Sequence, residues 1–187
     1  VVCRRITAAP MEELIARYMY FLRAKKRNKN STTEALRKFY ERNKYQYLKQ
    51  PNTMDDLKAL ALFWESIADQ DTTRFSDGVL KKLFVLNYAP NGMWQHITSV
   101  YFLQHRTKDG VLEDTKFENF LDRITAFIFA YAITNPGVNA LRTPVYDEMV
   151  NIVNGSEATF SKYKFNSTQA RSFVENYAFT NQRGVTR

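Results

Sequence analysis

Apolar residues recur at intervals of three and four positions along most of the chain, and short polar segments separate the runs. Leu14, Tyr18 and Phe21 show this spacing near the N-terminus. A period of this kind gathers apolar side chains on one face of an α-helix. The pattern predicts helices over about residues 10–24, 31–48, 52–68, 76–88, 91–104, 113–133, 143–155 and 167–178.

Several predicted helices begin at residues with helix-capping chemistry. Residues 31–34 have the sequence Ser-Thr-Thr-Glu, which is a capping-box pattern, and Ser76 is a second candidate cap. Thr143-Pro144 is expected to cap the helix over 143–155, with Asp147 and Glu148 in its first turn. Within the helix over 113–133, residues 126–132 are apolar on every side, which predicts that this part is surrounded by other helices.

The composition agrees with a helical fold. The chain of 187 residues has 6 glycines and 5 prolines, few enough to favour long regular elements over many tight turns. Its hydrophobic content of 44% can supply a sizeable core. No repeat period recurs along it. We therefore predict an all-α fold, an irregular bundle of about seven or eight helices that forms one domain over residues 1–187.

No segment has the character of a membrane span or of a signal peptide. The longest apolar run, from Ile124 to Ile133, is about half the length needed to cross a bilayer. The lone Cys3 indicates a reducing compartment, and we expect a cytoplasmic protein without a membrane partner. Because the chain starts without Met and ends at Arg187 without a structural signal, we expect a fragment of a longer multidomain protein.

The positive charge is concentrated in one segment. The net charge is +8, and the segment from Arg23 to Lys49 holds ten basic residues against Glu34 and Glu41, so the remainder of the chain is balanced. A localised field of this kind attracts polyanions. The candidate nucleic-acid-binding residues are Arg23, Lys25, Lys26, Arg27, Lys29, Arg37, Lys38, Arg42 and Lys44.

Aromatic residues alternate with these cations. Phe39, Tyr40, Tyr45 and Tyr47 could stack on exposed bases or on arginine, although Phe39 and Tyr40 also fit the core of a helix. Two other interpretations of the segment stay open. It can be a solvated basic face that keeps the domain soluble, or Lys25-Lys26-Arg27 can be a nuclear-localisation cluster.

Residues with catalytic or metal-binding chemistry are few and scattered. If the helix over 91–104 extends to His105, that residue lies on the opposite face from His96, so the two histidines cannot share a metal. Cys3 has no general base near it in the sequence, and no glycine-rich phosphate loop is present. The acidic pairs 55–56, 113–114 and 147–148 open predicted helices, where they complement the helix dipole. We predict no catalytic residue, no metal and no cofactor.

Several stretches resemble the helical region of bacterial restriction proteins of the GmrSD type. They are Phe75-Ser76-Asp77, Leu80 to Leu86, Ala89 to Trp94, Ser99 to Phe102, Phe120 to Arg123 and Leu141 to Tyr146. Proteins of that family join a ParB/sulfiredoxin-like nucleotide-hydrolysing domain to an HNH-type nuclease domain and restrict modified foreign DNA. The catalytic signatures of both domains are absent here. The resemblance therefore implies a helical middle region that positions flanking catalytic domains of the same chain.

Two functional hypotheses follow. The first is a non-catalytic helical domain of a DNA-restriction protein, which contacts double-stranded DNA through the basic segment. The second is a protein–protein interaction scaffold without a nucleic-acid role. Phosphate contacts would make the affinity for DNA fall steeply with salt, and this dependence separates the two.

Overall fold

A computed structural model describes residues 9–27, 31, 34–135, 137, 139–163 and 165–171, and every regular element in these ranges is helical. The elements are α1 (Met11–Lys25), α2 (Leu36–Arg42), the 3-10 helix η1 (Gln46–Lys49), α3 (Thr53–Ala68), α4 (Asp77–Leu86), α5 (Met93–His105), α6 (Asp114–Thr134) and α7 (Arg142–Val153). Residues 167–171 are also helical. The predicted all-α, multi-helix bundle is confirmed.

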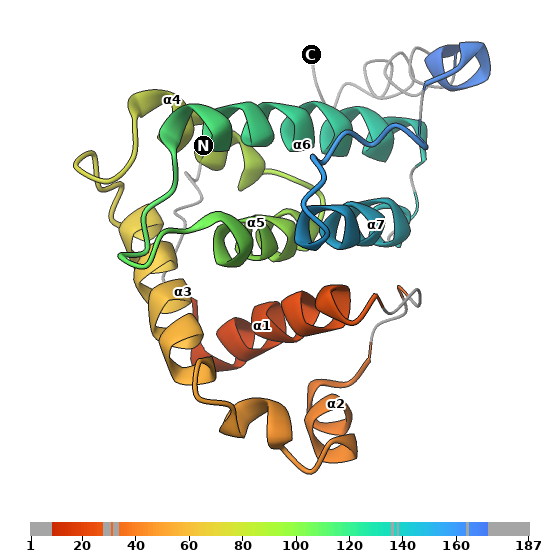
Figure 1. Ribbon diagram of the computed structural model, residues 1–187. Helices are drawn as coiled ribbons and strands as arrows, with labels where there is room; N and C mark the ends of the chain where they lie inside the picture. The colour runs from red at the N-terminus through yellow and green to blue at the C-terminus, as the bar shows by residue number, and fades with distance from the viewer. Residues whose placement is uncertain are drawn as a thin grey trace.

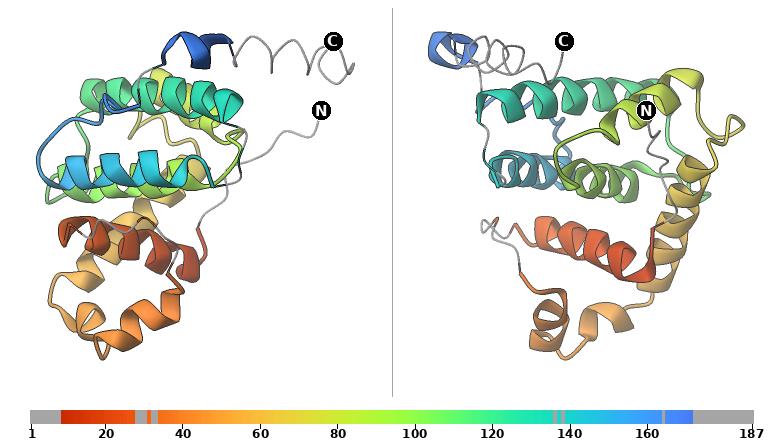
Figure 2. Two further views of the ribbon diagram at one scale, coloured as in Figure 1. Left: turned by 90° about the vertical axis from the view of Figure 1, so that its right-hand side faces the viewer. Right: turned by 180° about the vertical axis from the view of Figure 1, so that it is seen from behind.

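The helices are stacked in layers (Figure 1). α4 and α6 form the layer at one end, α5 and α7 form the next, and α1 packs below them. α2 and η1 lie beyond α1 at the other end, and α3 crosses the layers along one side, as the turned views also show (Figure 2). α5 contacts α1, α3 and α7, so it occupies the centre of the stack.

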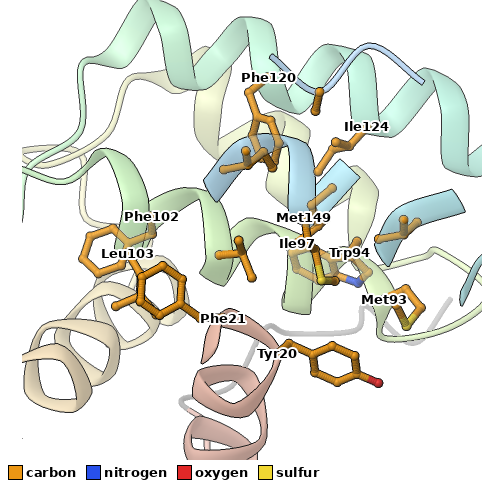
Figure 3. Packing of buried hydrophobic residues seen from close by; sticks show 14 of the residues in the cluster. Tyr20, Phe21, Met93, Trp94, Ile97, Phe102, Leu103, Phe120, Ile124 and Met149 are labelled. Carbon is orange, nitrogen blue, oxygen red and sulfur yellow. The ribbon is translucent and has the colours of Figure 1, made fainter. Parts of the chain in front are cut away.

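The central helix α5 is buried along most of its length, and Ile97, Val100 and Phe102 have no exposed surface. Figure 3 shows how α1, α6 and α7 meet around it: Tyr20 and Phe21 approach α5 from one side, and Phe120, Ile124 and Met149 lie on the other. An apolar helix at the centre gives every surrounding helix a face to bury.

A buried polar pair fixes α3 against α5. The Ser99 hydroxyl donates to the carbonyl of Gln95 at 2.7 Å and accepts a hydrogen bond from the Trp64 indole N–H at 2.9 Å. The Trp64 ring also meets the Trp94 ring edge-on, with 5.7 Å between centroids. The guanidinium of Arg17, from α1, covers the Trp64 ring at 4.2 Å. Trp64 thereby joins three helices.

A cluster of phenylalanine rings extends the core toward α6. Phe63 stacks on Phe102 with 4.2 Å between ring centroids, and it meets Phe75 and Phe117 at 5.8 and 6.0 Å. These rings come from α3, α5, α6 and the segment before α4. Large aromatic side chains contribute much buried area at little cost in rotamer freedom, so the cluster is a principal source of stability.

Two capping residues act as expected from their chemistry. The Ser76 side chain accepts a hydrogen bond from the backbone N–H of Val79 at 3.3 Å, which confirms it as the cap of α4. Glu113 is the N-cap of α6 and accepts from the N–H of Lys116 at 3.3 Å. The capping box predicted at residues 31–34 is wrong, since Ala35 is the N-cap of α2 without a side-chain hydrogen bond and the Ser31 hydroxyl bonds to that of Thr143 at 2.8 Å. Thr32 and Thr33 lie outside the described residues.

The helix predicted over 31–48 is wrong in extent. α2 covers only Leu36–Arg42, and the turn at Asn43–Tyr45 separates it from η1. Lys44 and Tyr45 both adopt left-handed backbone conformations, with φ of 50° and 59°. The turn folds η1 back so that the Tyr47 ring stacks on Phe39, 5.3 Å away. This tertiary contact overrides the local helical pattern.

The start of α7 also differs from the prediction. The helix begins at Arg142, one residue before Thr143, and Leu141 is its N-cap without a side-chain hydrogen bond. Asp147 and Glu148 consequently lie in the second turn, beyond reach of the first free N–H groups. Helix-dipole complementation does not explain this pair.

The apolar second half of α6 is less enclosed than predicted. Ala126 is exposed, and Phe129, Tyr131 and Ile133 are half-buried, while Phe127 and Ile128 point into the core. None of the helices in the described part of the chain has the length and apolar character to cross a membrane. The predicted helix over 167–178 is described only as far as residue 171, where the chain is helical.

Replacing Trp64 with alanine is expected to lower the free energy of unfolding by about 3–5 kcal/mol, because the change leaves a cavity and removes the partner of Ser99. The side chain is 1% exposed. Urea denaturation followed by circular dichroism measures the loss. The control is Leu62→Ala on the outer face of the same helix, where the residue is 54% exposed and the expected change is below about 1 kcal/mol. Equal losses in the two variants would contradict this account of the core.

Glu148 provides a second test of the fold. Its carboxylate is 1% exposed and accepts the backbone N–H groups of Thr159 and Phe160 at 3.0 and 3.1 Å, which fastens the chain after α7 to that helix. Glu148→Ala is expected to cost about 3 kcal/mol, since the buried amide of Phe160 and the amide of Thr159 both lose a charged acceptor. The exposed Glu65→Ala is the matched control in the same urea experiment. A near-neutral Glu148→Ala would show that this anchor is dispensable.

Candidate nucleic-acid interface

The last turn of α1 presents the first group of cations. Lys25, Lys26 and Arg27 are exposed. The Lys25 ammonium lies 4.7 Å from the centroid of the Phe21 ring. The Lys26 ammonium lies 4.2 Å from the Tyr47 ring, which places the end of α1 in contact with η1. The end of α1 and η1 are therefore adjacent in space, although they are far apart in the sequence.

α2 has one buried face and one charged face. Phe39 and Tyr40 are buried, and the Tyr40 hydroxyl donates to the carbonyl of Ile15 at 3.1 Å. These two rings belong to the core and cannot stack on a nucleic acid. On the opposite face, Arg37, Lys38 and Arg42 are exposed.

Both arginines of this face are paired with a glutamate. Arg37 bonds to Glu41 at 2.6 Å, and this hydrogen bond lowers the pKa of the Glu41 carboxyl below its usual range. Arg42 bonds to Glu34 at 2.9 Å. The two acidic residues of the segment are thus both engaged by neighbouring arginines. Such surface pairs are weak and can exchange partners when a phosphate approaches.

Five lysines of the segment make no ion pair within the part of the chain that the structure describes. They are Lys25, Lys26, Lys38, Lys44 and Lys49, and all five are exposed. Because no carboxylate neutralises them, they carry most of the available positive field. The eight exposed cations together are named the basic surface: Lys25, Lys26, Arg27, Arg37, Lys38, Arg42, Lys44 and Lys49.

The turn after α2 sets an aromatic ring among these charges. Tyr45 is 42% exposed, and its hydroxyl donates to Glu41 at 3.3 Å. It follows Lys44, and the left-handed conformation of both residues costs about 1–2 kcal/mol for each relative to an ordinary helical conformation. Strained backbone of this kind is frequent at functional sites. Of the four aromatic residues named in this segment, Tyr45 is the exposed one.

Arg23 does not join the basic surface, and its prediction as a nucleic-acid contact is corrected. The residue is 2% exposed, and its guanidinium lies 5.6 Å from the Tyr20 ring and 5.3 Å from the Tyr146 ring. The helical period directs it toward α7, two residues before the exposed Lys25. Lys29 lies outside the described residues. Lys49, which the candidate set omits, is exposed at the end of η1 and belongs with the others.

The two histidines occupy different surroundings at the two ends of α5. His96 packs on Tyr20 with 4.3 Å between ring centroids, and burial, together with the charge of Arg17, lowers its pKa to about 3. His105 is the last residue of α5 and packs on Tyr101. No group of histidine, cysteine, aspartate and glutamate in the described ranges could hold a metal ion. Cys3 lies outside these ranges.

The acidic pairs serve structural contacts. Asp56 accepts from Arg106 at 2.7 Å and from the Tyr18 hydroxyl at 3.2 Å, which ties α3 to the end of α5 and to α1. Asp147 accepts from Tyr163 at 2.8 Å. These contacts hold elements together, and the carboxylates do not face one another as an acid–base pair would.

Comparison of the chain with protein-family models, with curated proteins and with solved structures finds no match in any of the three. The functional argument therefore depends on the arrangement of residues described above. The resemblance of several helical stretches to restriction proteins stays a prediction.

Burial of His96 gives the fold a pH dependence. Between about pH 3 and pH 6.5 the unfolded chain binds a proton at His96 that the folded chain does not, so stability rises with pH in this window and falls as pH drops through it. We expect the variant His96→Gln to show a shallower dependence, by up to about 1.4 kcal/mol per pH unit. Urea unfolding of the wild type and of His96→Gln between pH 4 and pH 8 measures this. Parallel curves for the wild type and His96→Gln would contradict it.

Proposed function

We propose that this chain is a non-catalytic helical domain that contacts double-stranded DNA through the basic surface. The observation that carries the proposal is the position of the charge. The excess positive charge of the sequence lies between Arg23 and Lys49. α2 and η1, which carry part of it, lie at one end of the helical stack, and the Lys26 ammonium contacts the Tyr47 ring of η1. Lysine and arginine side chains that neutralise phosphates supply most of the affinity of non-specific DNA binding.

The opposite end of the stack has a different character. Taken together, α4 and α6 carry as many acidic as basic residues. Lys82 bonds to both Glu118 and Asp122, at 2.9 and 3.2 Å. Charge that served only to keep the protein soluble could be spread over the whole surface and would not have to lie at one end of the stack. The confinement favours a polyanionic partner over general solvation.

The chemistry of the basic surface favours contact with the phosphate backbone over reading of bases. Lys38, Lys44 and Lys49 are flexible point charges, and Arg37 and Arg42 can exchange a carboxylate for a phosphate of similar geometry. Contacts of this kind position a protein on the duplex without specifying sequence. In a restriction protein of the type that the sequence resembles, such a domain would hold flanking catalytic domains on their substrate.

A protein-docking role is the second candidate, and one feature favours it. Phe84, Val85 and Tyr88 are exposed on and just after α4, and the rings of Phe84 and Tyr88 meet edge-on at 5.4 Å. Exposed apolar side chains that cluster in this way are typical of protein contacts. This surface lies in the layer opposite the basic surface, so the two roles can be tested separately.

Fluorescence anisotropy with a labelled duplex, at salt concentrations between about 50 and 200 mM, tests the proposal. The variant Lys38→Gln, Lys44→Gln, Lys49→Gln removes three of the five unpaired lysines, those of α2, of the turn after it and of η1. We expect its affinity at low salt to fall about tenfold or more, and the slope of log affinity against log salt to fall by about one unit for each lysine.

The control carries the same change of charge at exposed lysines outside the segment: Lys58→Gln, Lys81→Gln, Lys108→Gln. It is expected to bind nearly as the wild type does. Equal losses in the two triple variants would reduce the effect to net charge and remove the basic surface as a site. Absence of binding by the wild type at low salt would reject the DNA proposal and leave the docking role.

A further inference from the structure

A surface pocket lies in the half of the molecule away from the basic surface. It has a volume of about 150 Å³ and is enclosed by the end of α5, one face of α6 and the chain that follows α7. The α6 residues that line it are Lys116, Asn119, Phe120 and Arg123. Their spacing of three and four positions places them on one stripe of that helix.

The floor of the pocket is aromatic and rigid. Tyr101 stacks on Phe120 with 4.0 Å between ring centroids and an angle of 16° between the ring planes. The His105 ring packs on the other end of Tyr101, at 4.4 Å. Phe117 supports the stack from within the core, 5.8 Å from Tyr101. Both rings line the pocket, so an apolar group can pack against the parts of them that the stack leaves uncovered.

The wall formed by residues 155–158 is held in place from both sides. Gly155 ends α7 with φ of 80°, a conformation that glycine adopts without strain, and the N–H of Ser156 bonds to the carbonyl of Asn151 at 3.0 Å. On the far side, Glu148 binds the N–H groups of Thr159 and Phe160. The pocket is therefore formed before any ligand arrives, which lowers the entropic cost of binding.

The polar lining contains two cations, one carboxylate and an amide. Lys116 and Arg123 stand two turns apart on α6, with the amide of Asn119 between them, and Glu157 is the acidic residue in the lining. Lys116 pairs with Glu113 at 3.3 Å, and Arg123 pairs with Glu157. Both pairs are exposed to water, where they contribute little energy, so an incoming anion can replace either carboxylate at small cost.

His105 completes the lining as a neutral donor and acceptor. Burial of part of its ring and the charge of Lys116 lower the pKa of the imidazole below its ordinary value. An oxyanion bound beside Lys116 would oppose that effect and raise the pKa of His105. The ring thus reports on occupation of the pocket.

We propose that this pocket binds a small organic anion, a carboxylate or phosphate ester, whose oxyanion lies between Lys116 and Arg123 and whose apolar part lies on Tyr101 and Phe120. Lys116, Arg123 and the amide of Asn119 recognise the negative charge once the carboxylates are displaced, and the aromatic side chains accept the apolar part. The site is separate from the basic surface and does not depend on DNA binding.

Nuclear magnetic resonance of the histidine rings in the full chain tests the proposal. The probes are benzoate and phenyl phosphate, with uncharged benzamide as the matched control. Because the chain has two histidines, the spectrum of His105→Gln assigns the signals. We expect benzoate or phenyl phosphate to shift the His105 signals in a saturable way and to raise its pKa, while the His96 signals stay unchanged.

Substitutions in the lining give the decisive comparison. Lys116→Gln and Arg123→Gln are each expected to weaken binding of the anions about tenfold, since each removes a charge-assisted contact. Glu157→Gln is expected to strengthen binding several-fold, because it removes the carboxylate that competes for Arg123. Lys81→Gln, on the exposed face of α4, is expected to leave it unchanged.

The opposite signs at Arg123 and Glu157 separate a binding site from a structural effect, which would weaken binding in both variants. Circular dichroism confirms that each variant is folded. The proposal is overturned if neither anion shifts His105 up to about 10 mM, if benzamide binds as well as benzoate, or if Glu157→Gln weakens binding.

Discussion

The hydrogen bond between Trp64 and Ser99 is the contact on which the arrangement of the helices depends. A small side chain at position 99 lets α3 approach α5 closely, and its hydroxyl satisfies the buried indole N–H at the same time. Because α3 crosses the layers, its position relative to α5 fixes how far α1 on one side and α6 on the other stand from the centre. The phenylalanine cluster around Phe63 packs across the same crossing, where Phe63 of α3 stacks on Phe102 of α5.

Buried charged side chains fix features of the helix packing that apolar contacts alone do not determine. Arg17 lies over the Trp64 ring and bonds to Glu13 at 2.8 Å, so it fixes the rotation of α1 about its own axis. Burial lowers the pKa of Arg17 to about 10. Given that rotation, Arg23 faces the core, and Lys25, Lys26 and Arg27 emerge together at the end of the helix. The composition of the basic surface is therefore a consequence of packing in the core.

Most of the helices can be predicted from sequence because their ends carry local signals. Ser76 and Glu113 cap the helices they precede, and Pro51 and Pro90 follow the ends of η1 and α4. The break after α2 has no such signal, since the residues at the turn are Asn43, Lys44 and Tyr45, without glycine or proline. It arises from stacking of Tyr47 on Phe39, which only the folded chain brings together.

The candidate site likewise has a part that can be predicted from the sequence and a part that cannot. Clustering of charge along the chain predicts that a basic surface exists, because residues near in sequence stay near in space within two short helices. It does not predict that Arg23 is buried, since helical phase at the end of α1 depends on the partner helix α7. No pattern in the sequence predicts the pocket beside His105. Its lining comes from the end of α5, from α6 and from the chain after α7.

The unequal ends of the helical stack give the molecule a permanent electric dipole, with its positive end at α2 and η1. In the field of a polyanion such a body experiences a torque as well as an attraction. Screening confines this torque to separations within about a Debye length, 8–10 Å in physiological salt, so the positive end of the molecule turns toward the polyanion during the last part of the approach. The orientation of an encounter is thus decided before any side chain has touched its partner.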